Sequence, residues 1–119
     1  MTDYIEAAKE KFGKLLEEQL ARVDEMKKQD GFVNYKELDQ IKIGVCGGDG
    51  IGPAITGQTQ RVLEFLLQDE VKAGKVAFKT IDGLTIEHRA ETLKAIPDDV
   101  LEELKECHVI LKGPTTTPR

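Results

Sequence analysis

Residues 41–53, with the sequence IKIGVCGGDGIGP, constrain the fold of this chain more than any other stretch. Ile41, Ile43 and Val45 alternate with small or polar residues, as expected of a strand, and a cluster of glycines follows directly. Glycine permits positive φ and close backbone approach, and Pro53 suits a first helical turn because its missing N–H would have no partner there. The stretch therefore predicts a strand, a tight turn and a helix start, which together open a βαβ unit.

The sequence beyond this stretch continues the same α/β pattern. Apolar runs bounded by turn residues predict strands at 41–48, 76–81 and 109–111, the last of them covered on both faces of a parallel sheet. Helical periodicity and start signals predict helices at 53–70, at 85–95 and from Pro97 onward. The predicted fold class is α/β, a βαβαβ arrangement with parallel strands and right-handed crossovers.

A long amphipathic helix is predicted ahead of this unit, from residue 3 to about residue 28. Its apolar residues recur at steps of three and four and form one stripe, made of Ile5, Ala8, Phe12, Leu15, Leu16, Leu20, Val23 and Met26. The stripe can be buried on the body of the protein or on another subunit, and both readings stay open. We therefore expect a helical extension with its linker at 1–40 and the α/β part at 41–119.

Composition and charge exclude several functional classes. A formal net charge of −5 disfavours a nucleic-acid footprint, and the sequence has neither an apolar run of membrane-spanning length nor a secretory signal at its start. Cys46 and Cys107 lack both metal-ligand spacing and a disulfide framework. We therefore expect a cytoplasmic protein whose partners are small molecules or other proteins, with no nucleic acid and no membrane.

Candidate chemistry lies where the three predicted strands end, because ligands of parallel sheets gather at that edge. The residues there are Gly48-Asp49-Gly50, Asp82-Gly83 and Lys112-Gly113-Pro114. The first turn lacks the dinucleotide-binding spacing of glycines, and the Asp49 carboxylate would repel a phosphate, so a structural turn is favoured there.

The third strand end offers a cation and three threonine hydroxyls. Lys112 lies at its mouth, and the loop that follows is stiffened by Pro114 and Pro118. From the residues alone this is either an ordinary exit loop or a site for a polar ligand. Other candidates are weaker: His88 and His108 have no companions at metal spacing, and Glu87-His88-Arg89 is expected to be a solvated helix face.

Two motifs resemble the isocitrate/isopropylmalate dehydrogenase family. They are Asp49-Gly50-Ile51-Gly52-Pro53 and, later in the chain, Leu111-Lys112-Gly113-Pro114-Thr115-Thr116-Thr117-Pro118, the second in a form similar to the isocitrate enzymes. The resemblance covers about residues 41–118. In similar enzymes this second loop lies between the nicotinamide cofactor and the substrate. The resemblance therefore implies that Thr116 and Thr117 bind the cofactor and that Lys112 is close to the substrate.

The same resemblance implies an oxidoreductase that carries out metal-assisted oxidative decarboxylation of isocitrate or a related 2-hydroxy acid. NAD is the favoured cofactor, with NADP left open, and Mg²⁺ or Mn²⁺ would be bound by residues outside this chain. The family's catalytic and metal residues come from beyond residue 119, so we expect an N-terminal fragment of a homo-oligomeric enzyme, inactive alone and with neither catalytic nor metal residues. The alternative is a stand-alone interaction or subunit-assembly module that uses the amphipathic helix. The choice among isocitrate, homoisocitrate and isopropylmalate stays open.

Overall fold

The structure is a computed structural model that describes residues 2–29 and 31–117 of the chain. It divides into two compact units, Met1–Asn34 and Tyr35–Arg119.

The first unit consists mainly of one helix, α1 (Thr2–Lys28), as predicted. Ion pairs one turn apart follow its surface, among them Lys14 Nζ to Glu10 Oε1 at 2.8 Å. None of its residues is buried, since the unit contains no second element against which the apolar stripe could pack. Phe12 and Leu20 within that stripe are 60% and 65% exposed. The stripe is therefore an apolar surface without a partner inside its own unit.

The second unit is built on a three-stranded parallel sheet. Its strands are β1 (Ile41–Cys46), β2 (Val76–Thr80) and β3 (Val109–Lys112), in the order β2-β1-β3. In the register, Ile43 of β1 lies opposite Phe78 of β2 on one side and Val109 of β3 on the other. All three strands run in the same direction, so the predicted parallel α/β arrangement is confirmed.

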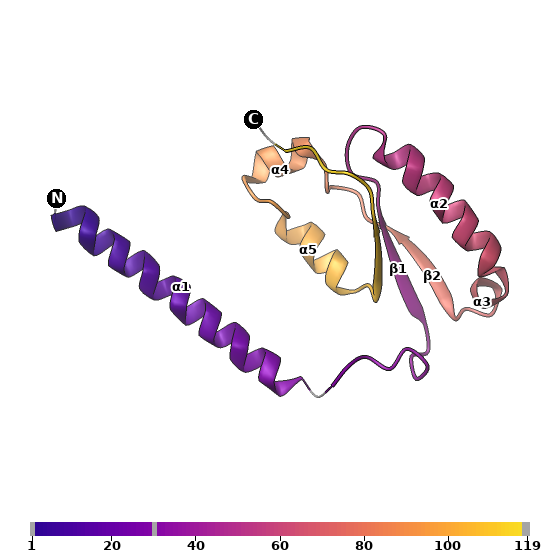
Figure 1. Ribbon diagram of the computed structural model, residues 1–119, viewed down its shortest axis with the longest axis horizontal. Coiled ribbons are helices and arrows are strands. Elements are labelled where there is room, and N and C mark those ends of the chain that lie inside the picture. The colour runs from indigo at the N-terminus through magenta and orange to yellow at the C-terminus, as the bar shows by residue number, and fades with distance from the viewer. Residues whose placement is uncertain (1, 30, 118–119) are drawn as a thin grey trace. The chain divides into compact units, whose positions relative to one another are not determined.

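Helices lie on both sides of this sheet. The four are α2 (Gly52–Leu66), α3 (Gln68–Lys72), α4 (Ile86–Thr92) and α5 (Asp98–Lys105). Figure 1 shows α2 and α3 on one side of the strands and α4 and α5 on the other. The helix predicted at 53–70 is interrupted at Leu67, which leaves helical geometry with φ −105° and ψ 21°.

A small apolar core joins the middle of the sheet to the α4–α5 layer. It comprises the buried residues Cys46, Ile81, Leu84 and Val100, with Leu104 and Cys107 packed against it. Burial raises the pKa of the Cys46 thiol above its ordinary value, because the charged thiolate loses solvation there. Both cysteines are free thiols, so they fill space in the core.

The third strand is less covered than its sequence predicts. Val109 and Ile110 are 44% and 41% exposed, so the prediction of a strand covered on both faces is wrong for this chain. The reason is topological, because β3 is an edge strand and only β1 flanks it within the described residues. Several apolar residues of α2 are also exposed, including Phe65 at 70%.

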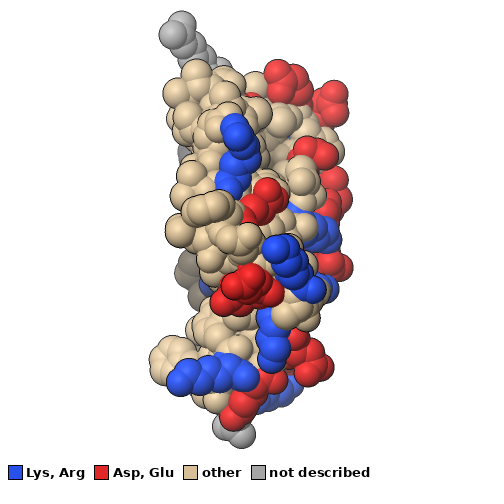
Figure 2. Space-filling model, turned by 90° about the vertical axis from the view of Figure 1, so that its right-hand side faces the viewer, with Lys and Arg blue, Asp and Glu red and all other residues tan. Residues whose placement is uncertain are grey.

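The surface over the α2 side of the sheet carries both signs of charge. Figure 2 shows lysine and arginine interspersed with acidic side chains and with wide areas of uncharged residues. Among the described residues, no helix is long and apolar enough to cross a membrane.

Candidate functional site

The ends of the three strands meet at one edge of the sheet, as their parallel direction requires. Each chain segment leaving the sheet makes a backbone hydrogen bond to β1 or to the turn that follows it. Ile81 N donates to Val45 O at 2.9 Å and Gly113 N donates to Cys46 O at 2.8 Å. Asp49 N, in the turn after β1, donates to Pro114 O at 2.8 Å. The three predicted strand-end segments are therefore brought together.

Glycines allow the turn after β1 to approach the loop after β3 this closely. Gly48 has φ +71°, and a Cβ built on it would lie 2.1 Å from Pro114 O. A Cβ on Gly113 would likewise lie 2.1 Å from Gly47 O. Side chains would force these segments apart, so the glycine cluster shapes the edge and fits the structural turn that the sequence favours.

The Asp49 carboxylate accepts hydrogen bonds from both neighbouring segments. Its Oδ1 accepts from the backbone N–H of Ile86 at the start of α4, and its Oδ2 accepts from the backbone N–H of Thr116 in the loop after β3, each at 2.8 Å. These two hydrogen bonds, first that from Thr116 and then that from Ile86, lower the pKa of the Asp49 carboxyl below its ordinary value. They do so because each N–H stabilises the charged form of the carboxylate. The acid joins three segments that are distant in the sequence.

Arg89 of α4 contacts the opposite side of the same loop. Its Nη1 donates to Thr116 O and its Nε donates to Ala95 O, both at 2.8 Å. His88 is also engaged, with Nε2 3.1 Å from the Asp99 carboxylate. Glu87 is exposed and His88 and Arg89 are half-exposed, so these residues lie at the surface as expected, and the fold adds acceptors from other segments beside His88 and Arg89.

The three residues predicted to meet ligands lie in or beside the loop after β3. Lys112 turns its ammonium back onto this loop, where Nζ donates to Gly113 O at 2.9 Å and lies 3.4 Å from Thr115 Oγ1. The backbone of Thr116 is held by Asp49 and Arg89, while Thr116 and Thr117 are exposed. The structure thus places these residues at the common edge of the sheet.

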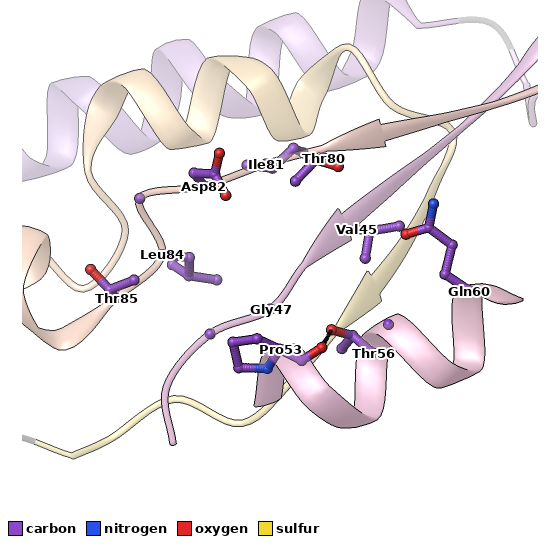
Figure 3. Close-up of a pocket in the computed structure, with 13 residues that line it drawn as sticks. Val45, Gly47, Pro53, Thr56, Gln60, Thr80, Ile81, Asp82, Leu84 and Thr85 are labelled. Atoms are coloured by element: carbon purple, nitrogen blue, oxygen red, sulfur yellow. Dashed lines mark hydrogen bonds between the residues drawn. The ribbon is translucent and has the colours of Figure 1, made fainter. Parts of the chain in front are cut away.

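A cavity of about 290 Å³ opens beside this edge, between α2 and the segment that follows β2. Figure 3 shows Thr56 and Gln60 of α2 on one side and Thr80, Asp82 and Thr85 on the other. The Thr56 hydroxyl already donates to Gly52 O at 2.8 Å within its own helix. The cavity therefore has a mixed apolar and polar lining.

The described residues offer no metal centre. Across residues 2–29 and 31–117, no three His, Cys, Asp or Glu side chains are grouped so that they could hold a metal ion. His88 and His108 have other contacts, the latter accepting from Lys42 N through Nδ1 at 3.0 Å.

Sequence reasoning missed the bridging roles of Asp49 and Arg89. From the sequence, Asp49 is part of the family-like turn and a group that would repel phosphate, and Arg89 is a surface charge on a solvated helix face. Their partners are remote, since the Asp49 bonds span 37 and 67 residues. The one available signal was an acidic residue inside a glycine-rich turn at the end of a central strand.

The chain is similar to known proteins, and the match to a family model lies within the second unit. The family model described as isocitrate/isopropylmalate dehydrogenase matches residues 42–119. A 3-isopropylmalate dehydrogenase of Mycolicibacterium gilvum is 38% identical over 78 residues, which are 66% of this chain and 21% of that protein. The 3-isopropylmalate dehydrogenase 1 of Bradyrhizobium diazoefficiens is 35% identical over 78 residues, 66% of this chain and 20% of that protein.

The chain therefore spans about a fifth of the length of these curated relatives. No solved structure gives a significant match.

Proposed function

Because the chain belongs to the isocitrate/isopropylmalate dehydrogenase family, we propose that its second unit supplies part of the nicotinamide-cofactor site of a 2-hydroxy-acid dehydrogenase. The observation that carries the proposal is the attachment of the loop after β3 to the turn after β1, at the carboxyl edge of a parallel sheet. Ligands of such sheets bind outside this edge.

The loop offers groups that suit a polar cofactor beside an anionic substrate. Thr116 and Thr117 are the proposed cofactor-binding residues, and both are exposed at the edge. Lys112 is the proposed substrate-proximal residue, since an ammonium group attracts a carboxylate and is here within reach of the same loop. The cofactor, when bound, accepts the hydride, and the protein supplies position and charge.

The proposed reaction is the oxidative decarboxylation of isocitrate or a related 2-hydroxy acid such as isopropylmalate, with NAD favoured over NADP. The threonine-rich loop favours isocitrate, whereas the relatives reported above are 3-isopropylmalate dehydrogenases. The described residues do not group into a metal site, so no step is assigned to a metal held by this chain. Mg²⁺ or Mn²⁺ would have to be held by other parts of a complete enzyme.

Titration of the ¹⁵N-labelled chain with NAD⁺, followed by NMR, tests the cofactor site. We expect shift changes confined to residues 47–50 and 112–117, with saturation in the millimolar range because only part of a pocket is present. Thr117→Val should weaken the response, since it removes a hydroxyl and keeps the shape. Thr59→Val, which makes the same change on α2, is the matched control. An unchanged spectrum at saturating NAD⁺, or changes elsewhere only, would contradict the proposal.

The chain by itself is expected to be inactive, because we propose that the catalytic and metal residues lie outside it. Incubation with isocitrate or 3-isopropylmalate, NAD⁺ and Mg²⁺ should give no NADH above the protein-free rate. Turnover by the pure chain would overturn this division of roles.

A second candidate function is subunit assembly through α1. The specific observation in its favour is the apolar stripe, of which no residue is buried. Phe12→Glu should then reduce the molar mass measured by multi-angle light scattering, because it places a charge in the stripe. Ala21→Glu, on the polar face of the same helix, should leave the mass unchanged. A monomeric parent chain would remove this candidate.

A further inference from the structure

We propose that Asp49 is a positioning residue, whose ionised carboxylate holds the backbone of the loop at 113–117 in the shape that presents Thr116 and Thr117 to a ligand. This inference rests on the proposed cofactor site for its functional meaning.

Both oxygens of the Asp49 carboxylate accept a hydrogen bond. Oδ1 accepts from Ile86 N and Oδ2 accepts from Thr116 N, each at 2.8 Å. The backbone of Asp49 adds a third connection, since its N–H donates to Pro114 O at 2.8 Å. One residue therefore binds the loop at two points, Pro114 and Thr116, and also binds the start of α4.

Helix capping does not account for these contacts. The N-cap of α4 is Thr85, whose side chain already accepts from His88 N. Asp49 instead accepts from Ile86 N, a separate donor in the first turn, through one oxygen. Its other oxygen accepts from Thr116 N, which lies outside the helix. The bond to Thr116 is thus a connection between loops.

The carbonyl side of Thr116 is held as well. Arg89 Nη1 donates to Thr116 O at 2.8 Å, and Arg89 Nε is anchored on Ala95 O. With its N–H on Asp49 and its C=O on Arg89, the peptide groups on both sides of Thr116 have one orientation. The side chain of Thr116 and the following residue, Thr117, remain exposed and can meet a ligand.

Both oxygens of the carboxylate accept backbone N–H groups, so its contacts are with the loop and with the start of α4. Arg89 is the charged side chain that acts on it, and it favours the ionised form. A group with two N–H donors and a nearby cation stays ionised well into acid, and its connection to the loop should be lost only below the ordinary range of an aspartate.

The test uses the whole 119-residue chain and begins without a mutation. In an NMR pH titration, the amide signals of Thr116 and Ile86 should shift together, with one midpoint below the ordinary aspartate value of about 3.9. Asp49→Asn should abolish this shared step. If the two amides titrate with different midpoints, or fail to titrate while the chain is folded, Asp49 does not bind both and the proposal fails.

Hydrogen exchange measures the strength of the connection. In Asp49→Asn, one side-chain oxygen remains for two donors, so the Thr116 amide should exchange roughly 10- to 100-fold faster than in the parent chain. Asp69→Asn on α3 makes the same charge change away from the loop and should leave this rate within about twofold. Equal acceleration in both variants would contradict the proposal.

The NAD⁺ titration separates this inference from the proposed function. Suppose the loop signals of the parent chain shift with NAD⁺. An apparent affinity at least about tenfold weaker in Asp49→Asn, with the β-sheet signals retained, then supports the positioning role in ligand binding. If the parent chain gives no response but Thr116 and Ile86 titrate together, the cofactor site fails while the positioning of the loop stands. If NAD⁺ binds equally in both chains, the site stands and the positioning role is overturned.

Discussion

Close backbone packing at the carboxyl edge of the sheet requires glycine at several positions. The glycines after β1 form a tight turn, and this turn contacts the loop after β3. Gly113 shows the point, because a Cβ there would meet Gly47 O at 2.1 Å although its own φ is not positive. The sequence indicates a glycine-rich turn. Only the contact between this turn and the loop after β3 shows why a side chain is excluded at Gly113.

A matched pair of glycine substitutions tests this packing. Gly113→Ala should lower the free energy of unfolding by about 1–3 kcal/mol, because the added methyl must displace backbone. Gly57→Ala lies in the interior of α2 with nothing within 4 Å of its added Cβ, and should raise it by about 0.5–1 kcal/mol. Urea denaturation measures both. A neutral Gly113→Ala would mean that the two segments can separate at no cost.

Leu93 carries backbone strain at the end of α4. It is the C-cap residue in the left-handed region, with φ 54° and ψ 29°, and it is 90% exposed. Leu93→Gly should therefore stabilise the chain by roughly 0.5–1 kcal/mol, since glycine adopts this conformation freely and little burial is lost. Leu66→Gly, within α2, is the control and should destabilise. Thermal unfolding followed by circular dichroism gives both values.

Among the elements, strands were the easiest to predict and helix boundaries the hardest. The expected strands at 41–48 and 76–81 correspond to β1 and β2, because alternating or apolar runs end there in glycine and aspartate. The interruption between α2 and α3 was missed because Leu66, Leu67 and Gln68 contain no glycine or proline. Exposure of β3 was missed for another reason: it depends on which elements flank the sheet.

The core links the sheet to the α4–α5 layer, so its truncation should destabilise the second unit. Ile81 follows β2, is 1% exposed and packs with Cys46 and Val100. Ile81→Ala should cost about 2–5 kcal/mol of unfolding free energy, through lost burial and the cavity left behind. Ile51→Ala, at a site 70% exposed, should cost less than about 0.5 kcal/mol. Urea denaturation midpoints, compared at an unchanged m-value, measure this difference in unfolding free energy.

At the scale of the whole molecule, the exposed edge of the sheet is the feature that most favours association between chains. β3 pairs with β1 on one side and has no strand on its other side within the described residues. Its Val109 and Ile110 are both partly exposed, and unpaired edges with apolar side chains favour association between chains. The matched 78 residues are only about a fifth of each relative reported above, so those proteins have further polypeptide that could cover such a surface.

Self-association of the isolated chain should therefore depend on β3. We expect the scattering mass to rise with protein concentration, and Val109→Lys to reduce this rise because it puts a charge on the edge. Val71→Lys, which adds the same charge on α3, should have a smaller effect. Equal effects of the two variants would indicate that net charge, and not the strand edge, controls association.

The position of β1 in the middle of the sheet has a consequence for the order of synthesis. The first strand to leave the ribosome is the one that both others need, yet it pairs with β3 only after the later part of the chain has been made. Lys42 and His108, which meet at this pairing, are 66 residues apart. Closure of the sheet must await the synthesis of β3, so one side of β1 has no strand to pair with until residues 109–112 have been made, and a holdase that shields residues 41–46 would act in that interval.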